Sequence, residues 1–599
     1  MPQDFSDPEP VGRAGRLAML RRQMRRHGID AFMVPVADAY GCSPLPACDR
    51  RLEWLTGFSG SAGLCIVSKA RAALFVDGRY TSQAGLQIDQ SLFEIHRAET
   101  GSITKWLSEH LPTDASLGID AWLHADSEVE RLRNGTPGIN IKCTDNLIDS
   151  VWQDQPAPPD SQLIDYPATY SGEPRGARIS RIAETLAHSG AEAMILTNCN
   201  SIAWLLNIRA SDIARNPVKR AFAILNRESE VALFARLPEP QRPEWLQSGI
   251  RLYPLENFLT RTGNLSGSVL IDPSVPHQLV RSLRQAGIDI VFRPDPVAAA
   301  KSVKHPAEIK GMEAAHIRDG VAMAEFLAWL QNRVATGPVS EIGAAMELER
   351  LRAKSELFRD LSFDTISASG PNAAIIHYRV THSTNRQLRK NENYLVDSGG
   401  QYLDGTTDVT RTVGFSTPRA EIRERYTEVL RGLIALSTLR WPATATGRVL
   451  DPIARQFLWR SGHDFGHGTG HGVGHYLDVH EGPAGISGRS EATLKPGMIL
   501  SIEPGFYAPG KFGIRLENLV LVTQSSLLET GYLEFRTLTL VPFDHRLINP
   551  EMLSTDEKSW LNVYHRRVRE TLAPQCTPPA RAWLSAACAP LPLGSSTLK

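Results

Sequence analysis

The sequence has no apolar run long enough to cross a membrane and no excess of charge of either sign. A membrane-spanning helix needs about 20 consecutive apolar residues, and no run in the 599 residues approaches that length. Lys and Arg together number 65, as do Asp and Glu, so the formal net charge is zero. This balance gives no electrostatic case for binding nucleic acid or an anionic membrane. The first residues, MPQDFSDPEPVGRAGRL, are acidic and polar, which is not typical of a signal peptide.

Cysteine is scarce, and its spacing is not that of a redox or zinc motif. The seven cysteines are odd in number and form no CxxC pair. Free thiols in a reducing compartment follow from this pattern, so we expect a cytoplasmic protein. Cys42 and Cys48 are the closest pair in sequence, and we interpret them as packing residues.

The length exceeds what one hydrophobic core can organise, and the N-terminal half contains a weak internal repeat. Residues 16–34 have helical apolar spacing, then Gly28, then a strand-like apolar run, and residues 178–196 repeat this plan with Gly190. Later strands are predicted at 72–80 and 231–239. The sequence therefore predicts two similar α/β domains.

Two Pro-containing segments divide the chain further. Residues 154–174 are Pro-rich and are interpreted as the linker between the two repeats. Residues 292–312 mark a second boundary, after which a helical period begins and short strands dominate from 394 to 523. From about Asp544 the pattern returns to helix.

The stretch FGHGTGHGVGHYLDVHEGP, residues 465–483, carries four histidines among alternating glycines. Histidines four apart on a helix would suggest a zinc motif, but each interior Gly costs a helix about 1 kcal/mol relative to Ala. We therefore expect an extended segment, in which His467 and His471 project from the same face. Glycine neighbours would let the backbone approach a ligand closely.

Four carboxylates lie in apolar, strand-like surroundings on either side of these histidines. Asp397 in NYLVDSGG and Asp408 in TTDVTRTV are separated by a turn sequence suited to a hairpin, and Glu503 and Glu517 follow in LSIEPGFY and GIRLENLVLV. A buried carboxylate is costly unless it is paired or binds a metal. One such acid could be an edge-strand salt bridge, but four around a Gly/His segment favour a metal site.

The order of these motifs resembles the pita-bread metallopeptidases of the methionine aminopeptidase, prolidase and aminopeptidase P type, and within them the three-domain aminopeptidase P family. The resemblance extends over nearly the whole chain, including PACDRRLEWLTGFSGSAG, VDGRY, SIAWLLNIRASDIARNPV, EAAHIRDGVAM and the segment 548–572. It implies an α/β multidomain fold. The expected parts are two creatinase-like N-terminal α/β domains at 1–155 and 165–300, a pita-bread (α+β) catalytic domain at 301–543, and a C-terminal helical extension at 544–599.

The resemblance also implies a dinuclear metal centre. Asp397 would bind one metal, Asp408 and Glu517 would bridge two, and His471 and Glu503 would complete the second. Such an oxygen-rich ligand set suits Mn²⁺ first, with Co²⁺ or Zn²⁺ as alternatives. A hydroxide shared by the two ions would be the nucleophile.

Further residues match the family's substrate contacts. His467 would steady the oxyanion, His377 and His480 would frame the proline, and Glu503 would be the general base. Arg79 in VDGRY would reach the substrate from the first domain. Arg515 is expected to pair with an acid near the site, and Tyr507 either to form a hydrogen bond near the substrate or to pack. Three further histidines, His382, His463 and His475, are interpreted as structural or loop residues, and Asp404 as a turn residue.

The implied reaction is hydrolysis of the first bond of peptides with proline at the second position, by a homodimer. A sister enzyme such as prolidase would use the same five ligands, and the two N-terminal domains and the extension favour aminopeptidase P. Two other readings are a metal-free creatinase-like hydrolase and an interaction module that has lost its metal. Both are disfavoured, because all five ligand types are present in register.

Overall fold

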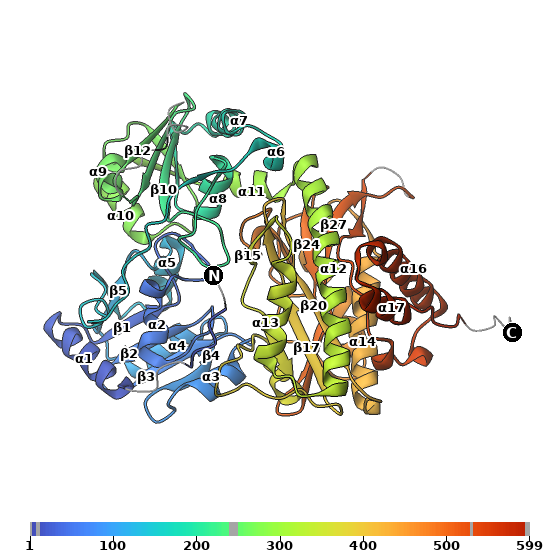
Figure 1. The fold of residues 1–599 in the computed structure, drawn as a ribbon. Helices are drawn as coiled ribbons and strands as arrows, with labels where there is room; N and C mark the ends of the chain where they lie inside the picture. Colours follow the sequence, from blue (N-terminus) through green and yellow to red (C-terminus); the bar gives the residue numbers. More distant parts are fainter. Residues whose placement is uncertain (1–2, 8–11, 239–242, 244–248, 528–530, 594–599) are drawn as a thin grey trace. The chain divides into compact units, whose positions relative to one another are not determined.

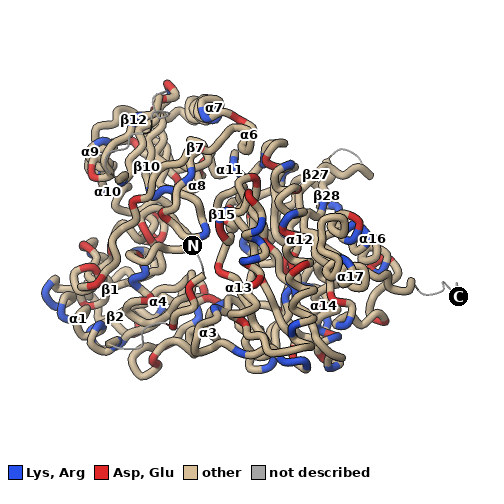
Figure 2. The backbone as a smooth tube through the Cα atoms, viewed as in Figure 1, with Lys and Arg blue, Asp and Glu red and all other residues tan. Residues whose placement is uncertain are grey.

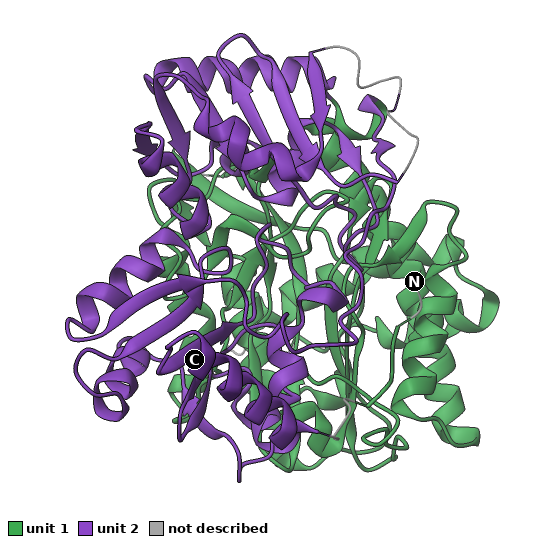
Figure 3. Ribbon diagram, turned by 90° about the vertical axis from the view of Figure 1, so that its left-hand side faces the viewer, with its two compact units in different colours: residues 1–7, 169–172, 301–599 green, residues 8–168, 173–300 purple. Residues whose placement is uncertain are grey.

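The computed structural model describes residues 3–7, 12–238, 243, 249–527 and 531–593. The chain divides into two compact units (Figures 1 and 3). The N-terminal unit comprises residues 8–168 and 173–300, and the C-terminal unit comprises residues 1–7, 169–172 and 301–599. Helices α6 (Ala168–Ser171) and α11 (Pro296–Ser302) contain residues at which the chain passes from one unit to the other.

The first half of the N-terminal unit is a six-stranded sheet with the order β4-β3-β2-β1-β5-β6. Its strands are β1 (Ala31–Pro35), β2 (Leu64–Ser68), β3 (Ala72–Val76), β4 (Glu94–Arg97), β5 (Ser116–Asp120) and β6 (Asn140–Thr144). Its helices are α1 (Arg13–Arg26), α2 (Arg51–Thr56), α3 (Thr81–Gln87), α4 (Ser102–His110) and α5 (Asp126–Gly135). The central strands are buried along their whole length, which explains their apolar composition.

The second half repeats this topology with the order β12-β11-β10-β8-β13-β14. Its strands are β8 (Ala193–Leu196), β10 (Ala221–Asn226), β11 (Val231–Ala235), β12 (Ile250–Tyr253), β13 (Ser268–Ile271) and β14 (Asp289–Phe292). Its helices are α7 (Arg175–His188), α8 (Cys199–Leu205), α9 (Phe258–Gly263) and α10 (His277–Gln285). Along both strand orders, neighbouring strands are parallel, antiparallel, antiparallel, parallel and parallel in turn. The predicted repeat is therefore confirmed.

The glycine in each copy of the repeat follows a long helix. Gly28 has φ +61° after α1, and Gly190 has φ +81° after α7. Only glycine adopts this left-handed conformation at little cost, so both glycines end the helix and turn the chain into the next strand. The Pro-rich segment is anchored to the second repeat through β7 (Ile164–Asp165), which pairs with β9 (Ile208–Arg209).

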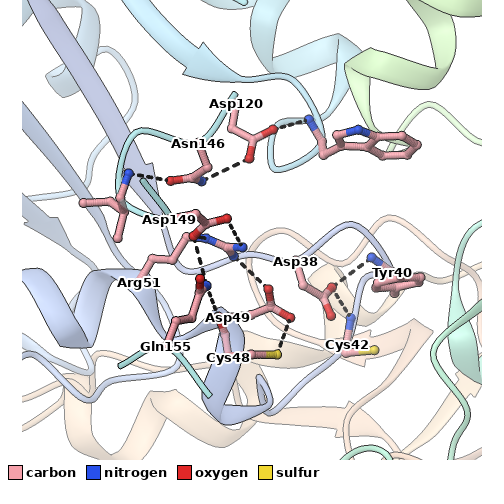
Figure 4. Close-up of polar contacts among 12 residues, drawn as sticks. Asp38, Tyr40, Cys42, Cys48, Asp49, Arg51, Asp120, Asn146, Asp149 and Gln155 are labelled. Atoms are coloured by element: carbon pink, nitrogen blue, oxygen red, sulfur yellow. Dashed lines mark hydrogen bonds and ion pairs between the residues drawn. The ribbon is translucent and has the colours of Figure 1, made fainter. Parts of the chain in front are cut away.

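An ion-pair network within the N-terminal unit joins the two repeats. Arg51 donates to Asp149 at 2.7 and 2.9 Å and to Asp49 at 2.8 Å (Figure 4), and Arg220 of the second repeat also binds Asp49. The ring of Phe222 stacks on Tyr40 with 4.7 Å between centroids. Polar and aromatic contacts therefore connect the two sheets.

All seven cysteines are free thiols, as the sequence predicts. Cys42 and Cys48 do not form a disulfide. The Sγ of Cys42 instead lies 3.3 Å from Sγ of Cys199, and both of these side chains are buried. Cys48 lies 3.6 Å from a carboxylate oxygen of Asp49. These thiols pack where the two repeats meet.

The C-terminal unit contains a short sheet and a long sheet that carry the predicted site. The short sheet, β16-β17-β20, consists of β16 (Ile366–Ser369), β17 (Asn393–Ser398) and β20 (Val409–Gly414). The long sheet, β21-β28-β27-β24-β22-β23, consists of β21 (Arg440–Pro442), β28 (Tyr532–Thr537), β27 (Asn518–Gln524), β24 (Ile499–Ile502), β22 (Gly470–Gly472) and β23 (Glu481–Ile486). Two further pieces are the sheet β15 (Phe358–Leu361), β18 (Gly400–Tyr402), β19 (Gly405–Thr406) and the hairpin β25 (Gly505–Ala508), β26 (Phe512–Arg515).

Helices pack against these sheets in the C-terminal unit. They are α12 (Pro306–Thr336), α13 (Glu341–Arg352), α14 (Ala420–Ser437), α15 (Gly447–Trp459), α16 (Thr555–Leu572) and α17 (Pro578–Ala587). A large apolar core includes residues of α14 and α15 together with Leu561, Val568 and Leu584 of the two last helices. The C-terminal helices are therefore part of this core rather than an appendage.

Charge is mixed in both units. Figure 2 shows Lys and Arg interspersed with Asp and Glu along the backbone, as expected from the balanced composition. Among the described residues, no helix combines the length and apolar character needed to cross a membrane.

Candidate metal centre and active site

Two strand pairs bring the four predicted acids together. β17 pairs with β20 so that Asp397 lies opposite Thr410, and Asp408 immediately precedes β20. β24 pairs with β27 so that Ile502 lies opposite Asn518, which places Glu503 and Glu517 side by side at the strand ends. The backbone N–H of Glu517 donates to the carbonyl of Thr410 at 3.1 Å and joins the two sheets.

The predicted hairpin between Asp397 and Asp408 is more elaborate than a tight turn. The strands do pair antiparallel, but the residues between them leave the sheet as β18 and β19 and pair with β15. Asp404 lies between β18 and β19 and forms an ion pair with Arg318, consistent with its interpretation as a turn residue. The two carboxylates come together because β17 pairs with β20, independently of the conformation of the residues between these strands.

Three of the predicted ligands form a compact group. Asp408, His471 and Glu517 each offer one ligand atom, and these atoms lie within 4.8 Å of one another. Nε2 of His471 is 3.6 Å from a carboxylate oxygen of Asp408 and 3.5 Å from one of Glu503. The charges of Asp397 and Glu503 also raise the pKa values of Asp408 and Glu517, so these two acids lie near the group.

The electrostatics of this cluster favour a bound cation. Burial and the neighbouring carboxylates raise the pKa of Asp408 well above its usual value and that of Glu517 to about 8. One carboxylate oxygen of Asp397 and one of Asp408 are buried without a hydrogen-bond partner among the described residues. Four ionised carboxylates carry a formal charge of −4, which two divalent cations would neutralise. The residues therefore fit a dinuclear centre.

His471 is held in the tautomer that a metal ligand needs. Its Nδ1 lies 2.9 Å from the carbonyl oxygen of Gly472, so Nδ1 carries the proton and donates it to that carbonyl. Nε2 then presents its lone pair towards Asp408 and Glu503. This is the usual second interaction of a metal-binding histidine.

The Gly/His segment is not helical, as predicted, but it is less extended than expected. Between residues 465 and 480 only Gly470–Gly472 form a strand, so His467 lies outside it and strand alternation does not relate His467 to His471. The two rings nevertheless flank Glu503, with Nδ1 of His467 at 4.0 Å and Nε2 of His471 at 3.5 Å from its oxygens. Loop geometry therefore places them together.

The glycines allow neighbouring backbone to approach. A Cβ added to Gly470 would lie 1.9 Å from the carbonyl oxygen of Ser501, and one added to Gly472 would lie 2.1 Å from that of Glu481. The sequence suggested close approach of a ligand; the described contacts are instead between the strands of the sheet. Glycine here lets β22 sit between β23 and β24.

A hydrogen-bonded chain links His467 to the acid cluster. Nε2 of His467 lies 2.9 Å from the hydroxyl of Tyr507, and Nη1 of Arg515 donates to the same hydroxyl at 2.8 Å. Nη2 of Arg515 donates to Asp397 at 2.6 Å. The expected pairing of Arg515 with an acid near the site is confirmed, and Tyr507 makes a hydrogen bond rather than only packing.

The other predicted substrate contacts are placed as follows. The ring of His480 lies 4.4 Å from that of His471, edge to face. His377 lies in the segment that follows the short helix η4 (Gly370–Ala374). Arg79 belongs to the N-terminal unit, where it binds Asp77.

The three histidines interpreted as structural have structural contacts. His475 is buried and its Nε2 lies 2.9 Å from the carbonyl oxygen of Asp404. The ring of His463 packs edge to face on Phe506. The backbone N–H of His382 donates to the carbonyl of Phe5.

Sequence reasoning missed two hydroxyls that orient the acids. Thr410 donates to Glu517 at 2.9 Å, and Ser501 donates to Glu503 at 3.3 Å. Each lies two residues from a predicted ligand, Thr410 after Asp408 and Ser501 before Glu503. In a strand, residues two apart share a face, so this spacing was the available signal.

Sequence reasoning also missed Arg455 of α15. It donates to the carbonyl oxygens of Phe465 and His467 at 2.9 and 2.6 Å and binds Asp451 at 2.8 Å. These contacts fix the backbone that carries His467. No local pattern in the sequence connects α15 to that segment.

Comparison with known proteins agrees with this arrangement. Residues 310–524 match the metallopeptidase family M24, residues 16–151 and 154–308 each match a creatinase/prolidase N-terminal domain, and residues 531–591 match the C-terminal region of the M24 peptidases. A probable Xaa-Pro aminopeptidase P of Laccaria bicolor is 39% identical over 97% of this chain and 94% of its own length. The chain belongs to the Xaa-Pro aminopeptidase P family.

Two other relatives match this chain along nearly their whole length. A probable Xaa-Pro aminopeptidase P of Talaromyces marneffei is 37% identical over 94% of this chain and 90% of its own length. The crystal structure of an X-prolyl aminopeptidase from Caenorhabditis elegans, described as a cytosolic enzyme with a di-nuclear active site, has a TM-score of 0.92 at 32% identity. The match covers 97% of this chain and 100% of the Caenorhabditis elegans chain.

Proposed function

We propose that this enzyme hydrolyses the N-terminal Xaa-Pro bond of peptides with the aid of two divalent metal ions. The observation that carries the proposal is the meeting of Asp408, His471 and Glu517 within 4.8 Å, with Glu503 beside them, in a member of this family. Xaa-Pro peptides are the substrate class given by the relatives' names.

The resemblance to this family implies which residues would hold the two ions. They are Asp397, Asp408, His471, Glu503 and Glu517. Four carboxylates and one imidazole suit Mn²⁺ first, with Co²⁺ or Zn²⁺ as alternatives. When bound, such a pair supplies a hydroxide at neutral pH and polarises the scissile carbonyl.

The chain's own residues would do the rest. Glu503 would accept the proton of the nucleophile and pass it to the departing nitrogen. His467, held by Tyr507, would contact the oxyanion. His377 and His480 would frame the proline ring, and Arg79 would contact the substrate from the N-terminal unit. The free N-terminal amine of the peptide would face the acidic cluster, which favours removal of a single residue.

Proline at the second position has a physical reason. An Xaa-Pro bond is a tertiary amide without an N–H, so a protease that grips that group cannot use it. A pocket that frames the ring with histidines does not need the N–H. Because the bond also populates the cis isomer, we expect trans peptides to be preferred.

Three further properties are part of the proposal. We expect a homodimer, a cytoplasmic location, and peptides rather than nucleic acid or membrane as partners. The cytosolic relative and the seven free thiols support the location.

Four matched tripeptides test the function. They carry either Pro or Ala at the second position and either a free or an acetylated amine, and they are assayed with Mn²⁺-loaded enzyme beside an Xaa-Pro dipeptide. We expect the free Pro tripeptide to be cleaved best. Acetylation should lower kcat/KM because it removes the amine, and Ala should lower it because it removes the ring.

Each alternative has its own outcome. Equal rates on the Pro and Ala peptides would indicate a broad aminopeptidase. Efficient cleavage of the acetylated peptide would exclude an aminopeptidase, and a preference for the dipeptide would indicate prolidase activity. Metal binding without hydrolysis of any of the five would favour an interaction module.

A further inference from the structure

The first residues of the chain lie against the segment that carries His377, more than 350 positions later in sequence. Residues 3–7 belong to the C-terminal unit. The side-chain amide of Gln3 binds the backbone of Thr365 in both directions, donating to its carbonyl at 3.1 Å and accepting from its N–H at 3.0 Å. Gln3 is buried, with 7% of its surface exposed. This pairing anchors the N-terminal segment beside β16.

The next residues bind directly to the segment after His377. The backbone N–H of His382 donates to the carbonyl of Phe5 at 2.9 Å. Arg379 donates to the carbonyl of Asp4 at 3.2 Å. Asp7 accepts hydrogen bonds from both the backbone and the hydroxyl of Ser383, and these bonds lower the pKa of its carboxyl.

Phe5 adds an apolar contact. Its ring packs against a cluster that includes Ala373 and Tyr378, on either side of His377 in sequence, and Leu395 of β17. Leu395 is two residues from the predicted ligand Asp397, in the same strand. The cluster therefore connects residues 3–7, the His377 segment and the strand that carries Asp397.

Glu341 holds the same segment from within the unit. Its side chain is fully buried and accepts hydrogen bonds from the hydroxyl of Tyr378 at 3.1 Å and the backbone N–H of Arg386 at 3.0 Å. It also accepts from the backbone N–H of Ser369 at 2.6 Å and the amide of Asn372 at 3.1 Å. These donors lie before and after His377.

Residues 375–386 contain neither helix nor strand, so their backbone is not fixed by a hydrogen-bond ladder. Ordering such a segment costs backbone entropy, which contacts with the rest of the protein must offset. A substrate-framing side chain needs to be held within about 0.5 Å of its productive position. Glu341 supplies one set of contacts to this segment, and residues 3–7 supply another.

We propose that residues 3–7 form a strap that positions His377 and thereby contributes to selectivity for proline. The strap residues are positioning residues, because they act through His377 rather than on the substrate. This inference rests on the proposed function, in which His377 frames the proline ring.

Point variants of the full-length, metal-loaded enzyme test the strap. Phe5→Asp should remove the apolar contact and Asp7→Ala the bonds to Ser383, whereas Phe5→Leu retains an apolar side chain. Ser6→Ala is the matched control, since Ser6 is exposed within the same segment. The readout is kcat/KM for the free Pro tripeptide divided by that for the Ala tripeptide.

We expect Phe5→Asp to lower this ratio about tenfold, mainly through a higher KM for the Pro peptide, with metal content unchanged. Asp7→Ala should lower it about threefold, and Phe5→Leu and Ser6→Ala should stay within twofold of the parent. A ratio that is unchanged in both Phe5→Asp and Asp7→Ala would overturn the proposal.

A double-mutant cycle separates positioning from a general structural effect. If the strap acts through His377, Phe5→Asp should cause no further loss of the ratio in a His377→Ala background. If the two variants lower the ratio independently, so that their losses multiply, the strap acts through another residue. If His377→Ala alone leaves the ratio unchanged, His377 does not determine selectivity and the proposal fails.

Hydrogen exchange provides a readout that does not require catalysis. Phe5→Asp should raise the exchange of amides 375–386 at least fivefold and leave β24 and β27 unchanged, while Ser6→Ala should change neither. If the parent cleaves no Xaa-Pro peptide, the proposed function fails and exchange still tests the strap. If the parent is active and neither exchange nor selectivity changes, the strap alone fails.

Discussion

The hydroxyl of Tyr507 lies 2.9 Å from Nε2 of His467. Nδ1 of His467 lies 2.7 Å from the carbonyl oxygen of Gly468 and therefore carries a proton that it donates there. Burial raises the pKa of Tyr507 to about 12, so its hydroxyl stays protonated at neutral pH. The hydroxyl accepts a hydrogen bond from Arg515 and donates one to His467. Because Arg515 also binds Asp397, this chain connects His467 to Asp397.

Tyr507→Phe should lower kcat about 10- to 100-fold, because His467 and Arg515 both lose a buried partner worth about 1–3 kcal/mol. Metal content should remain that of the parent, since Tyr507 is not a predicted ligand. Steady-state kinetics and elemental analysis measure the two effects. Tyr532→Phe, at an exposed tyrosine, is the control; a kcat for Tyr507→Phe within twofold of the parent would contradict the role of this contact.

Asp408→Asn or Glu517→Gln should abolish activity while the protein stays folded. Burial and the neighbouring carboxylates raise the pKa of both residues, and each change removes one of the charges that would hold the metal ions. Metal binding should therefore weaken, and the nucleophile should not be activated. Peptidase assays, metal analysis and thermal unfolding measure this. Glu491→Gln, an exposed acid paired with Arg448, is the control. Activity within tenfold of the parent at normal metal content would refute the ligand assignment.

The two histidines that flank Glu503 should respond differently to removal. His471→Ala should lose metal, because Nε2 of His471 faces the acids. His467→Ala should retain both ions and lose at least about 10²-fold in kcat, a typical loss for an oxyanion contact. Metal-to-protein ratios and kcat distinguish the variants, and the opposite result would mean that the roles of His467 and His471 are exchanged.

A histidine pair, with His565 buried and His545 half-buried, should make stability depend on pH. Nε2 of His565 accepts the backbone N–H of Phe543 at 3.0 Å, so its proton lies on Nδ1, 2.9 Å from Nε2 of His545. Burial lowers the pKa of both rings, that of His565 well below its ordinary value of 6.5. As the pH falls below about 6.5, the unfolded chain binds protons that the folded chain does not. The free energy of unfolding therefore falls, by up to about 1.4 kcal/mol per pH unit for each such ring.

His565→Gln removes one of these two rings and should weaken the dependence of stability on pH. Unfolding of the C-terminal unit by urea, measured at pH 6.5 and 5.5 in metal-loaded enzyme, compares the slopes. The slope should decrease by roughly 1 kcal/mol per pH unit relative to the parent. His27→Gln, at an exposed position, should leave the slope unchanged. Equal slopes for the parent and His565→Gln would show that His565 is not held neutral in the folded protein.

The sequence by itself determined the repeated α/β plan, the free thiols and the identity of the acids and histidines around the site. These features depend on local chemistry: a helix followed by Gly28 or Gly190, cysteines without a partner motif, and carboxylates in apolar strands. Burial of a charged group has a large cost wherever it occurs, so residues such as Asp408 and Glu517 stand out without a structure.

Only the tertiary structure decided how these residues meet and what holds them. Strand pairing, and not a tight turn, brings Asp397 beside Asp408. His471 reaches Glu503 from strand β22, whereas His467 reaches it from the loop before that strand. The contact of Phe5 with the His377 segment has no signal in the sequence. Such contacts join residues far apart along the chain, and their energy depends on packing and backbone hydrogen bonds that local residue patterns do not encode.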